Sequence, residues 1–336
     1  MLDEIIIVDN SKISYRNFRQ QTFETISNNL NIKIKIYAPE EPKLHLIFFS
    51  LLRASSKGFF SHRKLFILFS ISSILICPIL KIFGHKVICF FPGLGRTYRP
   101  IKNNFLLNNL RKITLIISNI SDLNIFLSES DRKLLSSRNK FSIFPSEGIN
   151  MKNYQLRFRK KIKNVAFIGR PIEEKGILEY LEIVKKASMN TDELNFYLYG
   201  SGFENKKIES EVLELSSKND NFFYEGYQFN KKFFSKVDLI IFPSCYGEGF
   251  PITVLEGMAS GCEIFIMDSH WTDELKNNSK LKIWKKECFL EESLKYLSSN
   301  MSENHSNIIH NRRIVQSKHD LNLIISKWEK IILSMN

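Results

Sequence analysis

The segment Leu239–Gly261, LIIFPSCYGEGFPITVLEGMASG, constrains the fold of this chain more than any other stretch. It begins inside a continuous apolar run, Val237–Phe242, which predicts a buried strand of a parallel sheet. A loop with glycines and Pro251 follows, and apolar residues at helical spacing then run from Ile252 to Ala259. A strand, a glycine-bearing loop and a helix in this order predict an open α/β sheet, in which ligands bind at the carboxyl ends of the strands.

Two carboxylates fall at this edge of the expected sheet. Glu248 lies in the loop, and Glu256 follows eight residues later on the helix. Backbone amides at the start of the helix, around Phe250, Ile252 and Thr253, favour an anion such as a phosphate. Amides for a diphosphate and carboxylates that accept from hydroxyls are what a sugar nucleotide requires. The spacing alone is equally consistent with a solvated loop acid and an ordinary acid on a helix surface.

Three segments carry a resemblance to a known family. EGFPITVLEGMASG resembles the E-x7-E signature of family 4 of the GT-B glycosyltransferases. FIGRPIEEKG at Phe167–Gly176 resembles that family's G-R-L-x-x-E-K-G motif, and LYGSGFENKKIE at Leu198–Glu209 resembles its V-G-x-G-P-x-x-x-x-L segment. The resemblance is good over residues 145–265 and weak over the N-terminal half. It implies an α/β fold of two Rossmann-like, doubly wound domains that face a cleft.

The resemblance also implies roles for individual residues. Glu248 would contact the donor sugar, Glu256 the ribose, and Arg170 and Lys175 the donor diphosphate, with Glu248, Arg170 and Lys175 forming the catalytic set. The other donor-binding residues that it implies are Gly169, Gly200, Gly202, Gly249, Phe250, Pro251, Ile252 and Thr253. Cations near the carboxyl end of a strand can neutralise a diphosphate leaving group, although a salt-bridged turn is an alternative. No D-x-D motif appears, so we expect no metal cofactor.

A second loop is expected to face the acceptor. Residues 92–98, PGLGRTY, resemble the T-G-L-G-x-x-F segment of family 4 enzymes that glycosylate polyprenyl-diphosphate-linked sugars. The acceptor-side residues implied are Gly93, Leu94, Gly95 and Arg96. A plain strand-to-helix turn is the alternative interpretation. Many family members carry a His-Gly pair where this chain has Pro92-Gly93, so no catalytic histidine is expected.

The apolar run Leu65–Leu80, LFILFSISSILICPIL, has no charged residue and is bounded by basic ones. Three interpretations compete: a buried crossover helix of the first sheet, a helix lying partly in the membrane interface, and a true membrane span. A span requires about twenty apolar residues, and Pro78 interrupts the end of this shorter run. The strand expected at Lys86–Phe91 favours the buried helix, because the sheet then continues directly after it.

The remaining pattern predicts three parts of the chain. Residues 1–155 form an acceptor-binding Rossmann-like domain, and residues 156–318 form a nucleotide-sugar-binding one. Residues 319–336 form a C-terminal helix that packs back on the first domain. The expected βαβ start comprises Glu4–Val8, Tyr15–Leu30 and Ile32–Tyr37. From Leu281 onward the pattern is helical and polar.

The amino-acid composition indicates which binding partners and which cellular compartment to expect. The formal net charge of +13 indicates nucleic acid, an anionic membrane surface or phosphorylated substrates as partners. No nucleic-acid-binding motif is present, and the apolar, aromatic-rich N-terminal half favours a membrane. Five cysteines without C-x-x-C spacing fit a reducing cytoplasm, and the acidic start MLDEIIIVD does not resemble a signal peptide. We therefore expect a cytoplasmic protein, peripheral on the inner face of the plasma membrane.

Together these features predict a retaining glycosyltransferase of hexosyl or N-acetylhexosaminyl type. Its donor would be a nucleoside-diphosphate sugar, with UDP as the expected nucleotide. Its acceptor would be a polyprenyl-diphosphate-linked or other lipid-linked saccharide in O-antigen, capsule or exopolysaccharide biosynthesis. A non-catalytic sugar-nucleotide-binding subunit is the alternative, since the histidine is absent and Asp268–Trp271 replaces the family's usual T-x-x-G-G. An integral membrane protein anchored through Leu65–Leu80 is a third hypothesis.

Overall fold

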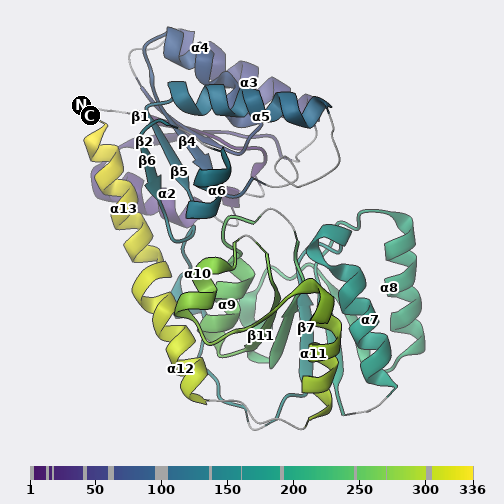
Figure 1. Ribbon diagram of the computed structural model, residues 1–336. Coiled ribbons are helices and arrows are strands. Elements are labelled where there is room, and N and C mark those ends of the chain that lie inside the picture. Colours follow the sequence, from purple (N-terminus) through teal and green to yellow (C-terminus); the bar gives the residue numbers. More distant parts are fainter. Residues whose placement is uncertain are drawn as a thin grey trace. The chain divides into compact units, whose positions relative to one another are not determined.

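The computed structural model describes residues 4–12, 15–16, 19–40, 44–59, 64–94, 105–135, 138–159, 161–189, 193–245, 248–269, 271–299 and 305–335. Contacts divide the chain into two compact units. The first unit comprises Met1–Gly148, Gly247–Phe250 and Leu321–Asn336, and the second comprises Ile149–Tyr246 and Pro251–Asp320. Each unit contains one six-stranded sheet, and every strand pairing is parallel (Figure 1). The expected α/β class with two doubly wound sheets is confirmed.

The sheet of the first unit has the strand order β2-β1-β3-β4-β5-β6. Its strands are β1 (Glu4–Val8), β2 (Lys33–Tyr37), β3 (Leu65–Phe69), β4 (Lys86–Phe91), β5 (Leu123–Phe126) and β6 (Phe141–Ile143). Its helices are α2 (Gln20–Leu30), α3 (Leu44–Phe59), the 3-10 turn η1 (Ser73–Ile76), α4 (Cys77–Ile82), α5 (Phe105–Ile120), α6 (Glu129–Leu135) and α13 (Leu321–Ser334).

Alternate residues of the central strand β3 pack on opposite faces of this sheet, because side chains of a strand point alternately to its two sides. Phe66 and Leu68 join a buried cluster with Ala54 of α3, Leu80 of α4 and Ile117 of α5. Helices α3, α4 and α5 therefore form the layer over this face of the sheet (Figure 1).

The opposite face is covered by α2 and by the C-terminal helix α13. The indole of Trp328 on α13 lies among four phenylalanine rings of the first unit, with centroid distances of 5.2 to 6.2 Å. These rings are Phe23, Phe69, Phe90 and Phe144. The apolar stripe of α13 is thus explained by burial against a sheet whose strands all lie within residues 4–143.

The prediction for Leu65–Leu80 is wrong in its secondary structure. Leu65–Phe69 is the fully buried strand β3, and the chain then turns at Ser70 into η1 and α4. A strand buried on both faces is continuously apolar, so it cannot be distinguished from a buried helix by periodicity. Neither an interfacial helix nor an anchor begins at Leu65. None of the helices in the described part of the chain combines the length and the hydropathy that a membrane span requires.

The sheet of the second unit has the strand order β12-β11-β10-β7-β8-β9. Its strands are β7 (Asn164–Ile168), β8 (Asn195–Tyr199), β9 (Phe222–Gly226), β10 (Leu239–Phe242), β11 (Glu263–Met267) and β12 (Lys282–Trp284). Its α-helices are α7 (Ile177–Ser188), α8 (Lys206–Lys218), α9 (Ile252–Ser260), α10 (Asp273–Asn278), α11 (Lys286–Ser298) and α12 (His305–Ile314). Its short turns are η3 (Met151–Asn153), η4 (Glu173–Lys175), η5 (Lys231–Ser235) and the π-helical η6 (Val315–His319).

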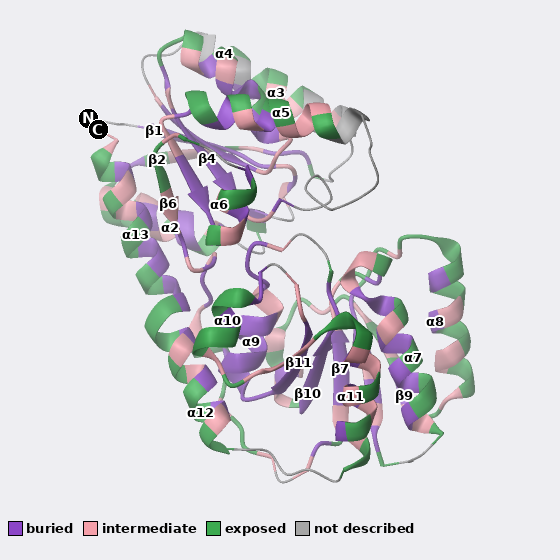
Figure 2. Cartoon of the chain, viewed as in Figure 1, coloured by how far each residue is buried: buried purple, intermediate pink, exposed green. Residues whose placement is uncertain are grey.

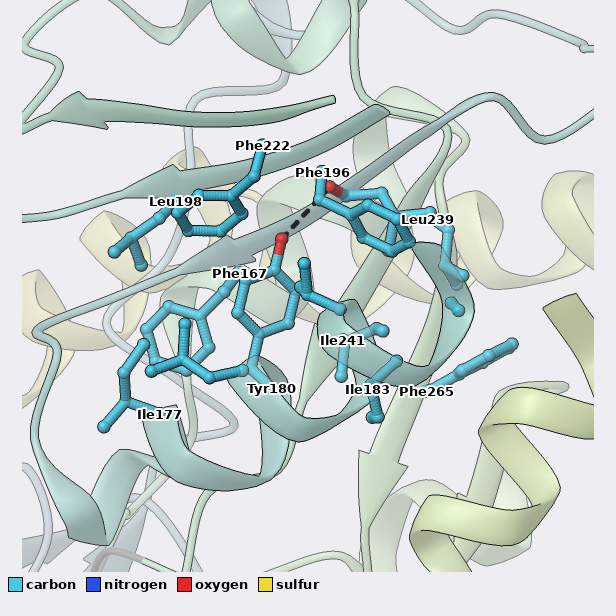
Figure 3. Packing of buried hydrophobic residues seen from close by; sticks show 14 of the residues in the cluster. Phe167, Ile177, Tyr180, Ile183, Phe196, Leu198, Phe222, Leu239, Ile241 and Phe265 are labelled. Atoms are coloured by element: carbon cyan, nitrogen blue, oxygen red, sulfur yellow. Dashed lines mark hydrogen bonds between the residues drawn. The ribbon is translucent and has the colours of Figure 1, made fainter. Parts of the chain in front are cut away.

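The core of the second unit is built around Tyr180 of α7. Its ring is fully buried beside Phe167 (Figure 3). Its hydroxyl donates a hydrogen bond of 2.8 Å to the carbonyl oxygen of Tyr197. A buried phenol needs such a partner, because an unsatisfied hydroxyl would cost free energy. The strand β12, which the polar pattern after Leu281 did not predict, completes this sheet beside β11.

Candidate functional site

The strand order of the second unit places a candidate site between β7 and β10. From β7 the chain winds outward through β8 and β9, and from β10 it winds the other way through β11 and β12. At such a reversal the loops leave the two adjacent strands in opposite directions and open a crevice at their carboxyl ends. The loops concerned are residues 169–176 after β7 and residues 243–251 after β10, which contain two of the three motifs.

These two loops are held together at their bases. The backbone amide of Cys245 donates a hydrogen bond of 2.9 Å to the carbonyl oxygen of Glu174. Gly176, with a left-handed φ of +80°, lies so close to Pro243 that a Cβ would overlap the proline carbonyl oxygen. Motifs that are about seventy residues apart in the chain therefore form one wall of the second unit.

Replacing Gly176 with alanine tests this close approach. We expect Gly176→Ala to destabilise the second unit by about 2–5 kcal/mol, from left-handed backbone strain of about 1–2 kcal/mol and overlap with Pro243 of about 1–3 kcal/mol. Gly202→Ala is a matched control, because Gly202 has the same φ of +80° but no heavy atom within 4 Å of the added Cβ. Amide hydrogen exchange in β7 and β10 measures both losses. Equal losses would contradict the close approach.

The two cations of the first motif lie after β7. Arg170 is exposed, and Lys175 is half-buried at the end of η4. The ammonium of Lys175 lies 6.0 Å from the ring centroid of Phe242, the last residue of β10. Trp271 packs edge-to-face on the same ring at 5.8 Å. Trp271 is buried and comes from the segment Asp268–Trp271, which departs from the family pattern. It thus supports the Phe242 ring that lies beside Lys175.

The glycines of this edge allow the backbones of β7 and β8 to approach each other. A Cβ at Gly200 would overlap the carbonyl oxygen of Gly169. The amide of Gly169 also donates to the carbonyl oxygen of Tyr199 at 2.9 Å. A side chain at Gly200 would therefore push the two loops apart. Close packing of the backbones is thus enough to explain why position 200 is a glycine, whether or not a ligand binds there.

Glu256 is not the ordinary helix-surface acid that the spacing allowed. Only 3% of its surface is exposed, and its Oε1 accepts a hydrogen bond of 2.6 Å from the Tyr154 hydroxyl. The ammonium of Lys231 on η5 lies 3.1 Å from the same oxygen. Burial, together with the charge of Glu256, raises the pKa of Tyr154 well above its usual range, so the phenol stays protonated and donates.

Helix α9 presents its N-terminus at the same edge of the sheet. Pro251, in extended conformation, is the residue before the helix, and Ile252 and Thr253 begin it. Proline fits this position because its backbone has no N–H to satisfy. The first backbone N–H groups of a helix lack partners within the helix and favour an anion. The chain thus places Lys175 and the start of α9 beside the same strand, β10.

Three residues of the central motif, Glu248, Gly249 and Phe250, are grouped with the first unit, because most of their contacts are with that unit. Glu248 is half-buried, Gly249 and Phe250 are buried, and a Cβ at Gly249 would overlap the carbonyl oxygen of Pro92. Because Glu248 is grouped with one unit and Arg170, Lys175 and Glu256 with the other, the convergence of these four on one ligand stays a prediction.

The acceptor-side loop is described only in part. Gly93 is half-buried, whereas Leu94 is 1% exposed and belongs to the core cluster of the first unit. Leu94 therefore has a packing role, which the resemblance did not indicate. Gly95 and Arg96 lie outside the described residues.

A buried ionic cluster in the first unit was not predicted at all. The guanidinium of Arg19 donates to Oδ2 of Asp9 at 2.8 Å and to Oε1 of Glu147 at 2.9 Å, and it lies 4.4 Å from the ring centroid of Phe69. Asp9 directly follows β1, and Phe69 ends β3, where the strand order of the first sheet reverses. One cation thus faces two carboxylates at the ligand-binding edge of this sheet.

No group of three or more His, Cys, Asp or Glu side chains that could hold a metal ion occurs among the described residues.

Comparison with known proteins places the second unit in a family. The family model described as "Glycosyl transferases group 1" matches residues 149–316, half of the chain. This chain belongs to that family. The match includes Arg170, Lys175, Glu248 and Glu256.

One curated relative matches at 29% identity over 218 residues. It is the N,N'-diacetylbacillosaminyl-diphospho-undecaprenol alpha-1,3-N-acetylgalactosaminyltransferase of Campylobacter jejuni. The match covers 58% of this chain and 55% of the relative, so the chain spans about half the length of the curated relative that it matches.

Solved structures with the same fold cover nearly the whole chain. A sucrose-phosphate synthase from Thermosynechococcus elongatus has a TM-score of 0.78 at 13% identity, over 99% of both chains. Anabaena HepE in complex with UDP-glucose has a TM-score of 0.75 at 11% identity, over 98% of this chain and 99% of that one. These likenesses show the fold, and with the family they identify it as GT-B.

Proposed function

We propose that this chain transfers a sugar from a UDP-linked donor to a lipid-linked saccharide acceptor, with retention of anomeric configuration. The observation that carries the proposal is the wall of the second unit in which the Glu174 carbonyl accepts from the Cys245 amide. This hydrogen bond joins the loop that contains Arg170 and Lys175 to the loop that precedes α9. Cations and helix amides beside the β7–β10 reversal suit a diphosphate.

The family and its relatives support this reaction class. The Campylobacter jejuni relative is named for transfer of N-acetylgalactosamine to a diphospho-undecaprenol-linked sugar. The Anabaena protein was solved with UDP-glucose. We infer by analogy that this chain uses an N-acetylhexosamine or hexose donor and a polyprenyl-diphosphate-linked acceptor, in the assembly of a bacterial surface polysaccharide.

In the proposed reaction, the bond between the donor's anomeric carbon and the β-phosphate oxygen breaks. The acceptor hydroxyl forms the new bond on the same face of the sugar, and its proton passes to the departing β-phosphate. Arg170, Lys175 and the first amides of α9 take up the charge that develops on the diphosphate, and Glu248 orients the sugar. We propose that these groups neutralise the diphosphate without a metal.

Glu256 fits a positioning role for the nucleotide in this scheme. In this scheme Oε2 would accept from the nucleotide while Oε1 is held by Tyr154 and Lys231. An anchored carboxylate can accept from a ribose hydroxyl without losing side-chain freedom on binding. Tyr154 and Lys231 are then supports that keep the carboxylate in place.

The experiment is a donor screen with the purified full chain. UDP- and GDP-sugars are incubated with and without a polyprenyl-diphosphate-linked saccharide, and release of free nucleotide is measured, in parallel with EDTA. We expect acceptor-dependent release of UDP from one donor, unchanged by EDTA, and a product whose anomeric proton coupling matches that of the donor. Nucleotide-sugar binding without release, across donors and acceptors, would instead favour the non-catalytic subunit.

A further inference from the structure

The positive charge of the chain is concentrated in one quarter of its sequence. Residues 42–121 contain no Asp or Glu, although the whole chain has 35, and they hold twelve of its 48 Lys and Arg residues. This segment therefore accounts for twelve of the thirteen net charges. It includes all of α3, α4 and α5, the helices that cover one face of the first sheet. The cations on these helices are Arg53, Lys57, Lys81, Arg111 and Lys112.

The same three helices expose large apolar side chains. On α5, Ile113, Ile116 and Ile120 are 44%, 62% and 40% exposed, and their spacing of three and four residues places them on one face. Thr114 and Ser118, which lie further round α5 from this stripe, are fully buried. The exposed stripe of α5 therefore points away from the core.

The neighbouring helices continue this exposed apolar face. Leu75 on η1, Ile79 and Ile82 on α4, and Phe83 just after α4 are exposed, and Ile82 is 79% exposed. On α3, Phe49 and Leu52 are 64% and 50% exposed, and Ala54 is buried. Helix α4 contacts both α3 and α5, and Figure 2 marks exposed residues on all three helices. We call the exposed apolar residues of α3, η1, α4 and α5, together with Phe83, the α3–α5 face. Exposed apolar side chains gathered on neighbouring helices mark an interaction surface.

The cations adjoin these apolar stripes. Lys112 is exposed and directly precedes Ile113, and Arg53 is exposed and directly follows Leu52. Lys81 on α4 forms an ion pair with Asp122, with 2.7 Å between its Nζ and Oδ2 of Asp122. Asp122 is the first acidic residue after the acid-free segment 42–121. These helices carry apolar side chains among Lys and Arg residues and have no acidic residue, which suits an anionic lipid surface. The apolar side chains would enter the acyl boundary, and the Lys and Arg side chains would meet the headgroups.

We propose that the α3–α5 face docks the protein on an anionic lipid bilayer. A second copy of this chain fits less well, because a symmetric contact would bring two acid-free basic faces together. Docking here would hold the protein on a membrane without a spanning segment. The proposal does not depend on the proposed reaction, because lipid binding is measured without donor or acceptor.

The test is flotation of the full chain with vesicles of phosphatidylcholine alone or with half phosphatidylglycerol. We expect binding to the anionic vesicles, weakening as salt rises from 50 to 500 mM. Ile113→Glu/Ile116→Glu should reduce the partition coefficient at least about tenfold. Arg53→Gln/Lys112→Gln should reduce it by about fivefold per charge removed. These side chains are exposed, so the variants should fold, as checked by circular dichroism.

Leu213→Glu is the matched control, since Leu213 is 51% exposed on α8 of the second unit. It should bind vesicles as the wild type does. The proposal is overturned if the wild type does not float with anionic vesicles, or if Leu213→Glu loses as much binding as the α5 double variant. It is also overturned if the α5 variant binds anionic vesicles as the wild type does. If that variant also converts a dimer to a monomer in light scattering, the face is a contact between copies.

Discussion

Lys175→Met is expected to lower kcat for sugar transfer by about 10²–10³-fold. In the proposed reaction, the ammonium of Lys175 meets negative charge that grows on the diphosphate as the sugar departs. The ammonium of Lys175 lies near the ring of Phe242. Methionine keeps an unbranched apolar side chain beside this ring but removes the charge. An interaction that strengthens in the transition state affects kcat more than KM, so KM should change by less than about fivefold.

Two further variants separate charge from packing at this position. Lys175→Arg retains the cation and should recover part of the lost rate, although its planar head has a different geometry. Lys185→Met removes a lysine of α7 that pairs with Glu211 at 2.6 Å on the surface, and it should change kcat by less than about twofold. Initial rates with the donor found in the screen provide the measurement. A Lys175→Met enzyme within fivefold of wild type would remove Lys175 from the catalytic set.

The sequence was most informative where local pattern and tertiary burial agree. The strand β10 is buried on both faces, so its residues form an apolar run that is visible without a structure. Helix α9 follows with a helical period, and Gly261 ends it in a left-handed conformation that glycine adopts readily. Strand, loop and helix could therefore all be predicted there, and the motif residues could be placed on them.

Prediction failed where the deciding contacts join distant parts of the chain. Tyr154 and Glu256 are 102 positions apart, and Arg19 and Glu147 are 128 apart, so no spacing rule connects either pair. At Leu65–Phe69 the failure has another cause: burial on both faces removed the alternation that identifies a strand. The serines around Ser70 were the one sequence signal that a turn divides this run.

Arg19→Met is expected to destabilise the first unit by about 3–5 kcal/mol. The guanidinium of Arg19 is buried and is the cation that Asp9 and Glu147 share, so its removal leaves two buried carboxylates without their counter-charge. Arg132→Met is the matched control, because Arg132 forms its ion pair with Glu129 near the surface and should cost at most about 1 kcal/mol. Amide exchange in β1 and β3 reports the opening free energy of this unit.

The buried carboxylates of this cluster make the stability of the first unit depend on pH. Burial raises the pKa of Glu147 above its ordinary 4.5, the charge of Asp9 raises it further, and Arg19 opposes both. A carboxyl with a raised pKa in the folded state binds its proton more tightly there. Its contribution to stability is therefore present below pH 4.5 and lost as the pH rises through the folded value. Wild-type stability should decrease over this interval. Burial also raises the pKa of Asp9, so Glu147→Gln should remove only part of the decrease.

The same linkage distinguishes a shared counter-charge from simple packing. Without Arg19 the pKa of Glu147 rises further, so Arg19→Met should show a steeper loss of stability with pH than the wild type. The triple variant Asp9→Asn/Arg19→Met/Glu147→Gln removes all three charges and should regain much of the lost stability, because a neutral cluster leaves no uncompensated ion. If it is instead as unstable as Arg19→Met, then Arg19 stabilises the first unit through its contact with Phe69 rather than through charge.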